Sequence, residues 1–453
     1  MESFNLLFVL PDADSKRVLV CKDSNHLPSY TELVGENVGF DEPHLYNKHF
    51  EGATGILVYR RYSFNTQKYV VFVFERANRN DFHVKNDYNW LLYDDFITTC
   101  HDAEIAEIIQ GVKHNYNKST NMLWVSVDGF APYFTWLKTV CDEKSIEING
   151  VITQLKNAYV SAVFCVPTNI GNLYMKIPGK VFINELPFAH ELRGLGIVNL
   201  PNWIDYNLDM NVFLMKDMGG NDLPHQSDLC ALKKVILQFT EIQKASISHI
   251  PLDFEHYDYS IVSHINKLKT FAEETCEILK GTPHELSESD KNKLTEQLAI
   301  AKSLLETGNN TAIPNVIQHG GVRQGNIRVI DKQYMFYDWA WGSVSHPFIE
   351  VISFLHIIRR TLPNESDKDM LADFYLNEWL DYGTHDELKQ IYSSLAVLRD
   401  LFFAIVDYDW VLAVKQSCDN PINIMSADGW LFERRLYYFA SVLRRFISTS
   451  LAI

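Results

Sequence analysis

The chain has 453 residues, which is more than one ordinary core holds, so we expect about two or three domains. Hydrophobic residues make up 47% of the sequence and charged residues 22%, which excludes a disordered or low-complexity protein. The formal net charge of -16 opposes binding to nucleic acid or anionic lipid. It favours a cationic substrate, with an acidic surface that only aids solubility as the alternative.

The cysteines and the start of the chain exclude further classes. Seven cysteines are scattered singly with no Cys-x-x-Cys pair, which fits neither a zinc site nor a disulfide framework. The start at Met1 lacks a basic region followed by an apolar run, and no stretch approaches the ~18 apolar residues that span a bilayer. We therefore expect a cytoplasmic protein.

The first part of the chain, up to about residue 112, has the pattern of a β-rich module. Segments rich in Val, Phe and Tyr predict strands at 5–10, 17–21, 55–62 and 68–75, followed by a helix at 103–112. The polar run at 113–120 indicates a linker. Asp128 and Gly129 then open a helix whose apolar face carries Phe130, Phe134, Leu137 and Cys141.

The second part reads as a small β lobe followed by a large helical lobe. A meander is predicted at 148–155, 161–166 and 173–177, then a helical stretch at 189–195 and a strand at 211–216. Helices are predicted after Ser227 as N-cap and at 262–280, 291–306, 367–382, 386–415 and 429–451, around a β island at 326–339. We expect a module at 1–120, a connecting helix at 121–147, and lobes at 148–220 and 221–453.

The most informative stretch runs from His319 through Gly321 and Arg323 to Asn326, followed by Tyr337-Asp338-Trp339. Asn326 and Asp338 lie twelve residues apart on either side of an apolar segment, which suits a hairpin whose ends converge. An amide oxygen and a carboxylate are ligands that Mg²⁺ accepts while it bridges phosphates. The alternative is a capped turn at His319 and Asn326 and a strand-end carboxylate at Asp338.

This stretch resembles the signature of aminoglycoside phosphotransferases and choline kinase-like small-molecule kinases, His-Gly-Asp-x-x-x-x-Asn followed by a strand and Ile/Phe-Asp-Trp. The resemblance implies an α+β, bilobal protein-kinase-like fold, with ATP and Mg²⁺ as cofactors and Asn326 and Asp338 as metal ligands. Gly321 stands where the family keeps its catalytic aspartate, so the usual general base is missing. Arg323 stands where relatives often have His, and either binds phosphate or forms a local salt bridge.

The resemblance also implies nucleotide contacts upstream. Lys176 on the third meander strand would hold the phosphates, with Glu185 fixing the lysine; the alternatives are a solvated strand lysine and a surface glutamate. The segment with Met215, Lys216 and Met218 is similar to the family's hinge that receives adenine, or is a strand ending in a glycine turn. No glycine-rich loop is present; the turn at 156–161 offers Ser161 as a phosphate contact or an ordinary hairpin serine.

Residues 1–112 resemble, more faintly, the Nudix-like module that precedes the kinase unit in some bacterial proteins. The resemblance lies in residues 17–20, Leu27-Pro28, residues 69–75 and Trp90. The region at 31–52 lacks the Arg-Glu-x-x-Glu-Glu core that binds Mg²⁺ and pyrophosphate, so no hydrolase activity is expected. The module is expected to bind or dock a protein partner, with a stabilising appendage as the alternative.

Three functions follow from these patterns. The first is an ATP- and Mg²⁺-dependent phosphotransferase acting on a hydroxyl of a small, cationic natural product. The second is a nucleotide-binding pseudokinase that serves as a scaffold, because of Gly321. In the third, the kinase-like unit is vestigial and the N-terminal module carries the function.

Overall fold

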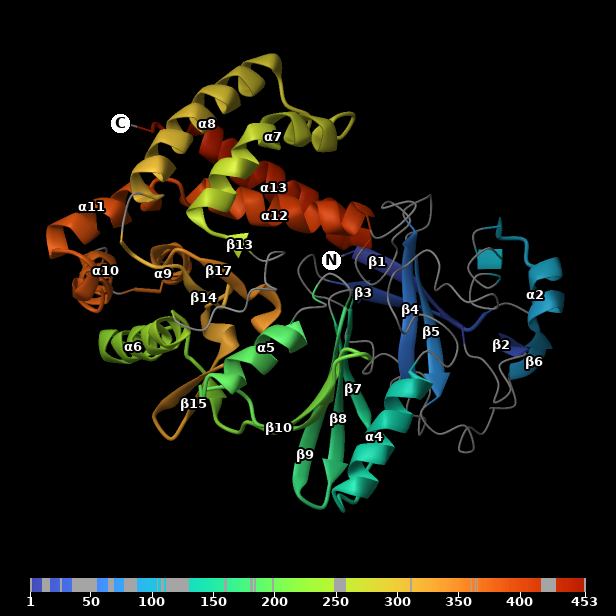
Figure 1. Cartoon of the computed structure of the whole chain (residues 1–453). Coiled ribbons are helices and arrows are strands. Elements are labelled where there is room, and N and C mark those ends of the chain that lie inside the picture. Colours follow the sequence, from blue (N-terminus) through green and yellow to red (C-terminus); the bar gives the residue numbers. More distant parts are fainter. Residues whose placement is uncertain are drawn as a thin grey trace. The chain divides into compact units, whose positions relative to one another are not determined.

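The computed structural model describes residues 2–9, 17–24, 27–34, 55–63, 69–76, 88–103, 105–106, 110, 130–158, 161–179, 182, 185–197, 199–247, 258–309, 312–359, 361–362, 364, 366–416 and 429–451. It is a mixed α+β structure, as expected (Figure 1). Contacts divide the chain into two compact units. The first unit is Met1–Ile183, Trp203–Asp217 and Leu412–Arg434, and the second is Asn184–Asn202, Met218–Val411 and Arg435–Ile453. The four predicted domain ranges stay predictions.

The N-terminal part of the first unit contains a four-stranded mixed sheet and a strand pair. The sheet has the order β3-β1-β5-β4, with β1 and β5 parallel. Its strands are β1 (Glu2–Val9), β3 (Ser29–Val34), β4 (Gly55–Ser63) and β5 (Tyr69–Arg76). The pair is β2 (Arg17–Cys21) with β6 (Tyr88–Leu92), followed by α2 (Tyr93–Thr99). The predicted linker at 113–120 and most of the region at 31–52 lie outside the described residues.

The same unit also contains a five-stranded antiparallel sheet of order β10-β11-β9-β8-β7. Its strands are β7 (Thr153–Ala158), β8 (Ser161–Thr168), β9 (Gly171–Pro178), β10 (Trp203–Asn207) and β11 (Val212–Lys216). The predicted meander is therefore present, but β7 continues to Ala158, so the connection before β8 is shorter than predicted. Helix α4 (Ala131–Glu143) packs on this sheet, with Phe130 and Phe134 5.0 and 5.2 Å from the ring of Phe164.

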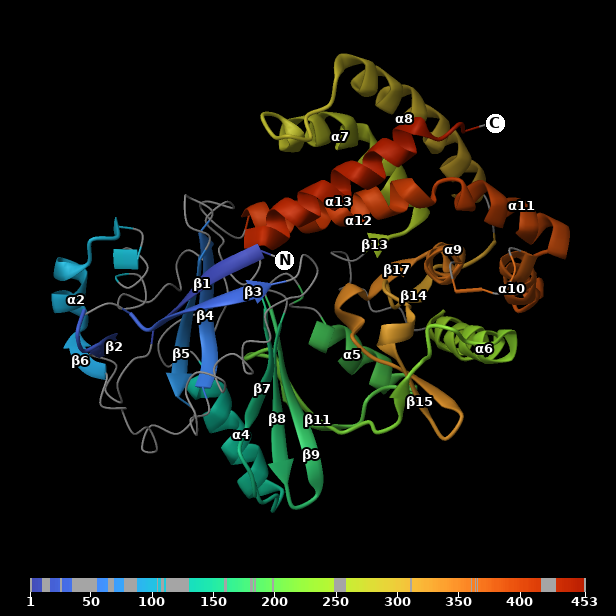
Figure 2. The ribbon, with the colours of Figure 1, turned by 180° about the vertical axis from the view of Figure 1, so that it is seen from behind.

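Helices dominate the second unit. They are α5 (Glu185–Gly194), α6 (Leu229–Ser246), α7 (Ile261–Leu279), α8 (Glu288–Asn309), α9 (Pro347–Ile358), α10 (Ser366–Asn377), α11 (His385–Ala396), and most of α12 (Arg399–Gln416) and α13 (Gly429–Ser448). Figures 1 and 2 show α7, α8, α12 and α13 on one side of this unit and α6, α9 and α10 on the other.

Three helix predictions need correction. The predicted helix at 386–415 is two helices, because the chain turns at Val397 and Leu398. The helix predicted at 367–382 ends at Asn377. Helix α6 is capped by Asp228, whose carboxylate accepts the backbone N–H of Ala231 at 2.7 Å; the hydroxyl of Ser227 instead donates to the carbonyl of Pro224.

Two small sheets lie among the helices of the second unit. One is β12 (Asn221–Asp222), β15 (Ile327–Ile330) and β16 (Gln333–Phe336); the other is β13 (Asp258–Tyr259), β17 (Ser343–Ser345) and β14 (Val316–Gln318). The predicted island is thus a hairpin. Its turn, Asp331 and Lys332, has φ values of 49° and 68°, the left-handed pair that matches the twist of two-residue hairpins. The loop at 319–326 joins β14 to β15.

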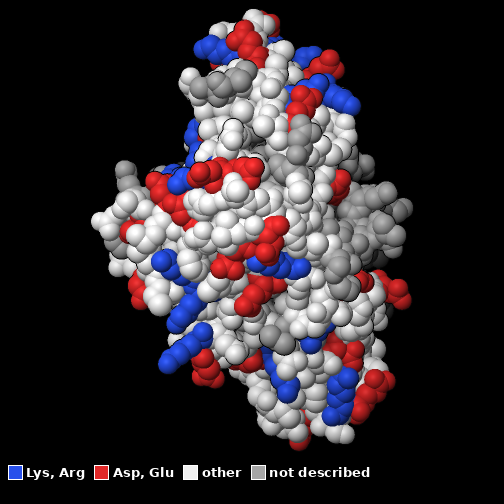
Figure 3. Space-filling view, turned by 60° about the vertical axis from the view of Figure 1, so that its left-hand side comes forward, with Lys and Arg blue, Asp and Glu red and all other residues white. Residues whose placement is uncertain are grey.

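Figure 3 shows acidic and basic side chains interspersed over one face of the molecule. None of the helices that the structure describes is long and apolar enough to cross a bilayer.

Candidate functional site

The loop at 319–326, here the 319–326 loop, begins with a fully buried histidine. The Nε2 atom of His319 lies 2.9 Å from the carbonyl oxygen of Tyr337, and its ring lies 4.6 Å from the ring of Trp339. Burial lowers the pKa of His319 to about 4, so the ring is neutral at neutral pH. Because a carbonyl can only accept, Nε2 carries the proton. The residue directly before Asp338 is therefore fixed to the start of the loop.

Asn326, at the end of the same loop, is also buried. Its Nδ2 atom donates to the carbonyl of Gly321 at 2.9 Å, which orients the amide. Among the described residues, its Oδ1 atom meets only the Nε of the exposed Arg323, at 3.4 Å. The backbone N–H of Tyr337 donates to the carbonyl of Asn326 at 3.1 Å, so the two ends of the hairpin lie together. The amide oxygen of Asn326 is thus the atom most available as a ligand.

Asp338 has an uncommon backbone conformation. Its φ of 64° and ψ of 58° lie in the left-handed region, which Asp tolerates better than most residues. It precedes the short helix η5 (Trp339–Trp341), and its side chain is half-buried. The His319 contact holds the residue before it, and the Nε1 of Trp339 donates to the carbonyl of Phe336 at 3.1 Å. Such conformations persist where the surroundings fix them, often at functional sites.

The two glycines of the loop differ in what they tolerate. Gly320 has a φ of 72°, and a Cβ there would lie 2.0 Å from the carbonyl oxygen of Trp341, so only glycine fits. A Cβ at Gly321 would lie 3.6 Å or more from its nearest neighbours, which are Asn326, His319 and Trp341. That is ordinary van der Waals distance. The backbone at 321 can therefore carry a side chain, although this sequence supplies none.

A buried carboxylate stabilises the backbone of the 319–326 loop. Glu350 on α9 accepts the backbone N–H of Gly320 at 2.7 Å and that of Val322 at 3.1 Å. Burial raises the pKa of Glu350 to about 7, and the two N–H bonds oppose that shift. The sequence analysis missed this residue. The available signal was a lone acidic side chain in the largely apolar helix Pro347–Ile358, where a buried charge requires a partner.

The raised pKa of Glu350 predicts a pH effect on stability. Its pKa lies above the ordinary value of 4.5, so the folded protein keeps a proton that the unfolded chain loses. The contribution of this proton to the free energy of unfolding is fully present below about pH 4.5. It is lost as the pH rises towards about 7, at roughly 1 kcal/mol per pH unit. We therefore expect the melting temperature of Glu350→Gln, relative to that of the wild type, to rise between about pH 5 and about pH 7 in thermal unfolding scans.

The matched control is Glu296→Gln, which alters an exposed glutamate on α8 and should show no such trend. A Glu350→Gln curve that stays parallel to the wild-type curve across this pH range would contradict the assignment.

Helix α5 packs directly on the segment that follows Asp338. The ring of Phe188 stacks on Trp339 at 6.2 Å, and a Cβ at Gly342 would lie 2.5 Å from the ring of Phe188. Close approach therefore requires glycine at 342. Glu185 is the first residue of α5 and is buried, so the helix that carries the predicted phosphate-site glutamate is fixed to the Asp338 segment.

The remaining predicted nucleotide residues lie on or next to the five-stranded sheet of the first unit. Lys176 is 8% exposed on β9, and Ser161 is buried at the start of β8. Met215 is half-buried and Lys216 exposed on β11, while Met218 opens the following segment of the second unit. Their roles at a nucleotide site stay predictions.

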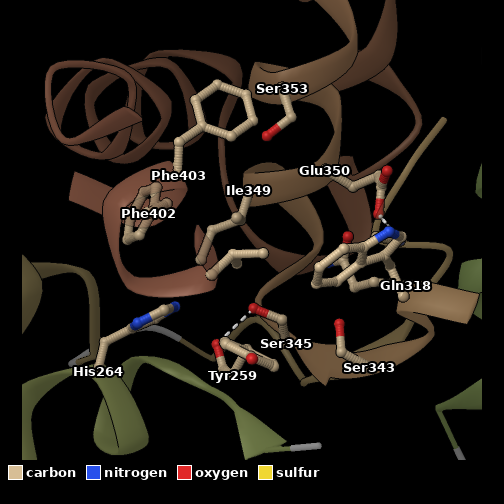
Figure 4. A pocket seen from close by; sticks show the side chains of 13 residues that line it. Tyr259, His264, Gln318, Ser343, Ser345, Ile349, Glu350, Ser353, Phe402 and Phe403 are labelled. Carbon is tan, nitrogen blue, oxygen red and sulfur yellow. Dashed lines mark hydrogen bonds between the residues drawn. The ribbon is translucent and has the colours of Figure 1, made fainter. Parts of the chain in front are cut away.

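A cavity lies next to the 319–326 loop within the second unit (Figure 4); we call it the loop cavity. Its unfilled space, including the part open to solvent, is about 590 Å³. Figure 4 shows Phe402 and Phe403 on one side, with Ser343 and Glu350 on the other. The lining residues are Tyr259, His264, Gln318, Gly320, Trp341, Ser343, Ser345, Ile349, Glu350, Ser353, Phe402, Phe403 and Val406.

Comparison with solved structures finds small-molecule kinases. A choline/ethanolamine kinase family protein from Mesorhizobium loti is similar at 15% identity over 67% of this chain and 90% of its own, with a TM-score of 0.45. Choline kinase from Cryptosporidium parvum is similar at 14% identity over 70% of this chain and 96% of its own, with a TM-score of 0.45. A macrolide 2'-phosphotransferase from Brachybacterium faecium is similar at 11% identity over 68% of this chain and 97% of its own, with a TM-score of 0.44.

No protein-family model matches the sequence, and no curated protein matches it. At these levels of similarity, the function of this chain has to rest on its own residues.

Proposed function

We propose that the chain is an ATP- and Mg²⁺-dependent phosphotransferase that acts on a hydroxyl group of a small molecule. The observation that carries this proposal is the hydrogen bond from the backbone N–H of Tyr337 to the carbonyl of Asn326. Because Tyr337 directly precedes Asp338 and is also held by His319, an amide side chain and a carboxylate side chain belong to the same end of the hairpin. Kinases use an Asn and an Asp in this way to hold their metal ions.

The residues present suit Mg²⁺. The amide of Asn326 is oriented by its bond to Gly321, which leaves Oδ1 as the outward ligand atom, and Asp338 adds a carboxylate at a fixed turn. Mg²⁺ commonly takes one or two such protein oxygens and completes its shell with phosphates and water. When bound, it would neutralise charge on the phosphates. Arg323, which contacts Oδ1 weakly at 3.4 Å, is the cation that would move from the amide to a phosphate oxygen.

The nucleotide contacts that the sequence predicts are part of this proposal. Lys176 would contact the phosphates and Glu185 would orient the lysine, as the paired lysine and glutamate of kinases do. Ser161 would contact a phosphate, and the segment with Met215, Lys216 and Met218 would receive the adenine. The acceptor would enter the loop cavity, whose lining includes Gly320.

Gly321 sets the expected rate. A general base contributes about 10² to 10⁴ in rate, and no side chain at 321 supplies one. Phosphoryl transfer depends mainly on positioning and charge stabilisation, so slow transfer survives the loss. The second candidate function, a nucleotide-binding pseudokinase, is favoured by this same glycine.

The proposal is tested with the full-length wild-type protein. Calorimetric titration with ATP should show binding that strengthens about tenfold or more when Mg²⁺ is added, because the metal shields the phosphates. ADP release should then be followed with hydroxylated small molecules as acceptors. Absence of ATP binding with and without Mg²⁺ would rule out both candidate functions, whereas Mg²⁺-dependent binding with no ADP release would favour the pseudokinase.

A further inference from the structure

The half-buried lining of the loop cavity, which we call its mouth, is mostly apolar, and its buried lining, the floor, is mostly polar. Four apolar side chains near the opening are half-buried: Trp341, Ile349, Phe403 and Val406. By contrast, His264, Gln318 and Ser345 are each only 2% exposed. A ligand that fills this space would therefore place an apolar body at the mouth and a polar group at the floor.

Several polar atoms at the floor have unused hydrogen-bonding capacity. The Nε2 of Gln318 donates to the carbonyl of His346 at 2.7 Å, which fixes the orientation of the amide. The Oε1 of Gln318 is then buried, and within the described chain it has no hydrogen-bond partner. Buried acceptors are almost always satisfied, because leaving one unpaired costs free energy. This oxygen indicates a ligand that brings an O–H or N–H donor.

Three further side chains converge on the same space. His264 is buried, and its ring lies 5.0 Å from the ring of Phe402 and 5.9 Å from that of Tyr259. Figure 4 shows His264 and the hydroxyl groups of Ser343 and Ser353 directed towards the cavity from different elements. Ser345 already donates its hydroxyl hydrogen to the carbonyl of Tyr259 at 2.6 Å. The floor therefore offers one buried acceptor together with groups that can both donate and accept.

The cavity offers no free charge to a ligand. Its one carboxylate, that of Glu350, already accepts two backbone N–H groups, and burial raises its pKa to about 7. Burial lowers the pKa of His264 to about 4, so this ring is neutral at neutral pH. An anion would find no positive charge on these groups, and the carboxyl of Glu350 is already engaged by the loop backbone. The aromatic lining leaves attraction of a cation to ring faces as the competing arrangement.

We infer that the loop cavity binds a neutral molecule with an apolar body and at least one O–H or N–H group that donates to Gln318. Its identity as the acceptor substrate rests on the proposed function. The net charge of -16 favours a cationic acceptor only on average, whereas the lining of this cavity favours an uncharged one.

Matched probes test the class of ligand on the wild-type protein. Binding of 2-naphthol, 2-methoxynaphthalene and benzyltrimethylammonium is measured by ligand-observed NMR. We expect 2-naphthol to bind about threefold to tenfold more tightly than its methyl ether, which keeps the apolar body but cannot donate. Equal binding of the two would overturn the role of the donor. Tighter binding of benzyltrimethylammonium would overturn the neutral class.

A pair of variants on α9 tests the location. Ser353→Phe fills the cavity mouth, whereas Ile357→Phe adds the same ring one turn later at an exposed position outside the lining. We expect the first variant to weaken 2-naphthol binding about tenfold or more and the second to leave it unchanged. If both variants weaken 2-naphthol binding equally, or if neither variant weakens it, the site is overturned.

Calorimetry of Mg·ATP on the same samples separates the two proposals. Intact Mg·ATP binding with failed probe binding would overturn only the cavity assignment. Intact probe binding without Mg·ATP binding would overturn the proposed function and leave the ligand class standing.

Discussion

Replacing Gly321 with aspartate is expected to raise ATP turnover by about 10² to 10⁴, the contribution of a positioned general base. The Cβ of the new residue would lie at ordinary contact distance from Asn326 and His319, so the loop accepts it without a backbone change. The new carboxylate would sit beside the proposed metal ligand and could take the proton of the attacking hydroxyl. Steady-state ADP release, measured with and without acceptor, checks the prediction.

Gly325→Asp is the matched control. Gly325 is exposed in the same loop, and nothing lies within 4 Å of a Cβ built there. This variant adds the same charge without a base at position 321, so turnover should not rise. Activity in Gly321→Asp alone, with none in the wild type, would identify the wild type as a pseudokinase. An active wild type that Gly321→Asp does not improve would count against the pseudokinase and against a missing base.

Asp338→Asn is expected to lower ATP turnover by about 10² or more, because the substitution removes the proposed negatively charged metal ligand. The bound metal ion would stabilise the transition state by several kcal/mol. Asparagine also tolerates left-handed backbone, so the turn should keep its φ of 64°. The affinity for ATP should lose most of its dependence on Mg²⁺. Titrations of ATP at several Mg²⁺ concentrations measure this directly.

Asp331→Asn provides the control for this prediction. Asp331 is an exposed carboxylate in the turn of the same hairpin, also with a positive φ, of 49°. The Asp331→Asn variant carries the same chemical change at the opposite end of the hairpin. The Mg²⁺ dependence of its ATP affinity and its ATP turnover should therefore be preserved. If the two variants behave alike, Asp338 is not a metal ligand.

Local patterns predicted the hairpin and many of the helices. The apolar segments around Asp331 and Lys332 specify a tight hairpin, which is why the approach of Asn326 to the Asp338 segment could be foreseen. The break between α11 and α12 could not be foreseen, because no glycine or proline marks it. Strand β3 was also missed, since its partner β1 lies far from it in sequence and tertiary pairing decides such strands.

The contacts behind the loop were beyond reach of the sequence for a related reason. Glu350 and Gly320 are thirty residues apart, and no local periodicity reports that a carboxylate on one helix meets two N–H groups of a loop. The loop cavity combines three helices, α7, α9 and α12, with the strands β13, β14 and β17, the short helix η5 and the 319–326 loop. Such a space exists only once the helices are packed, so no single segment carries its pattern.

The shape of the 319–326 loop does not depend on any side chain at its centre. Glu350 holds the N–H groups on either side of Gly321, His319 holds Tyr337, and Asn326 holds the carbonyl of Gly321 itself. None of these bonds uses a side chain at position 321, and a Cβ there would lie at ordinary contact distance from its neighbours. A substitution at this position is therefore expected to change the proposed proton transfer while leaving the hydrogen bonds of the loop in place.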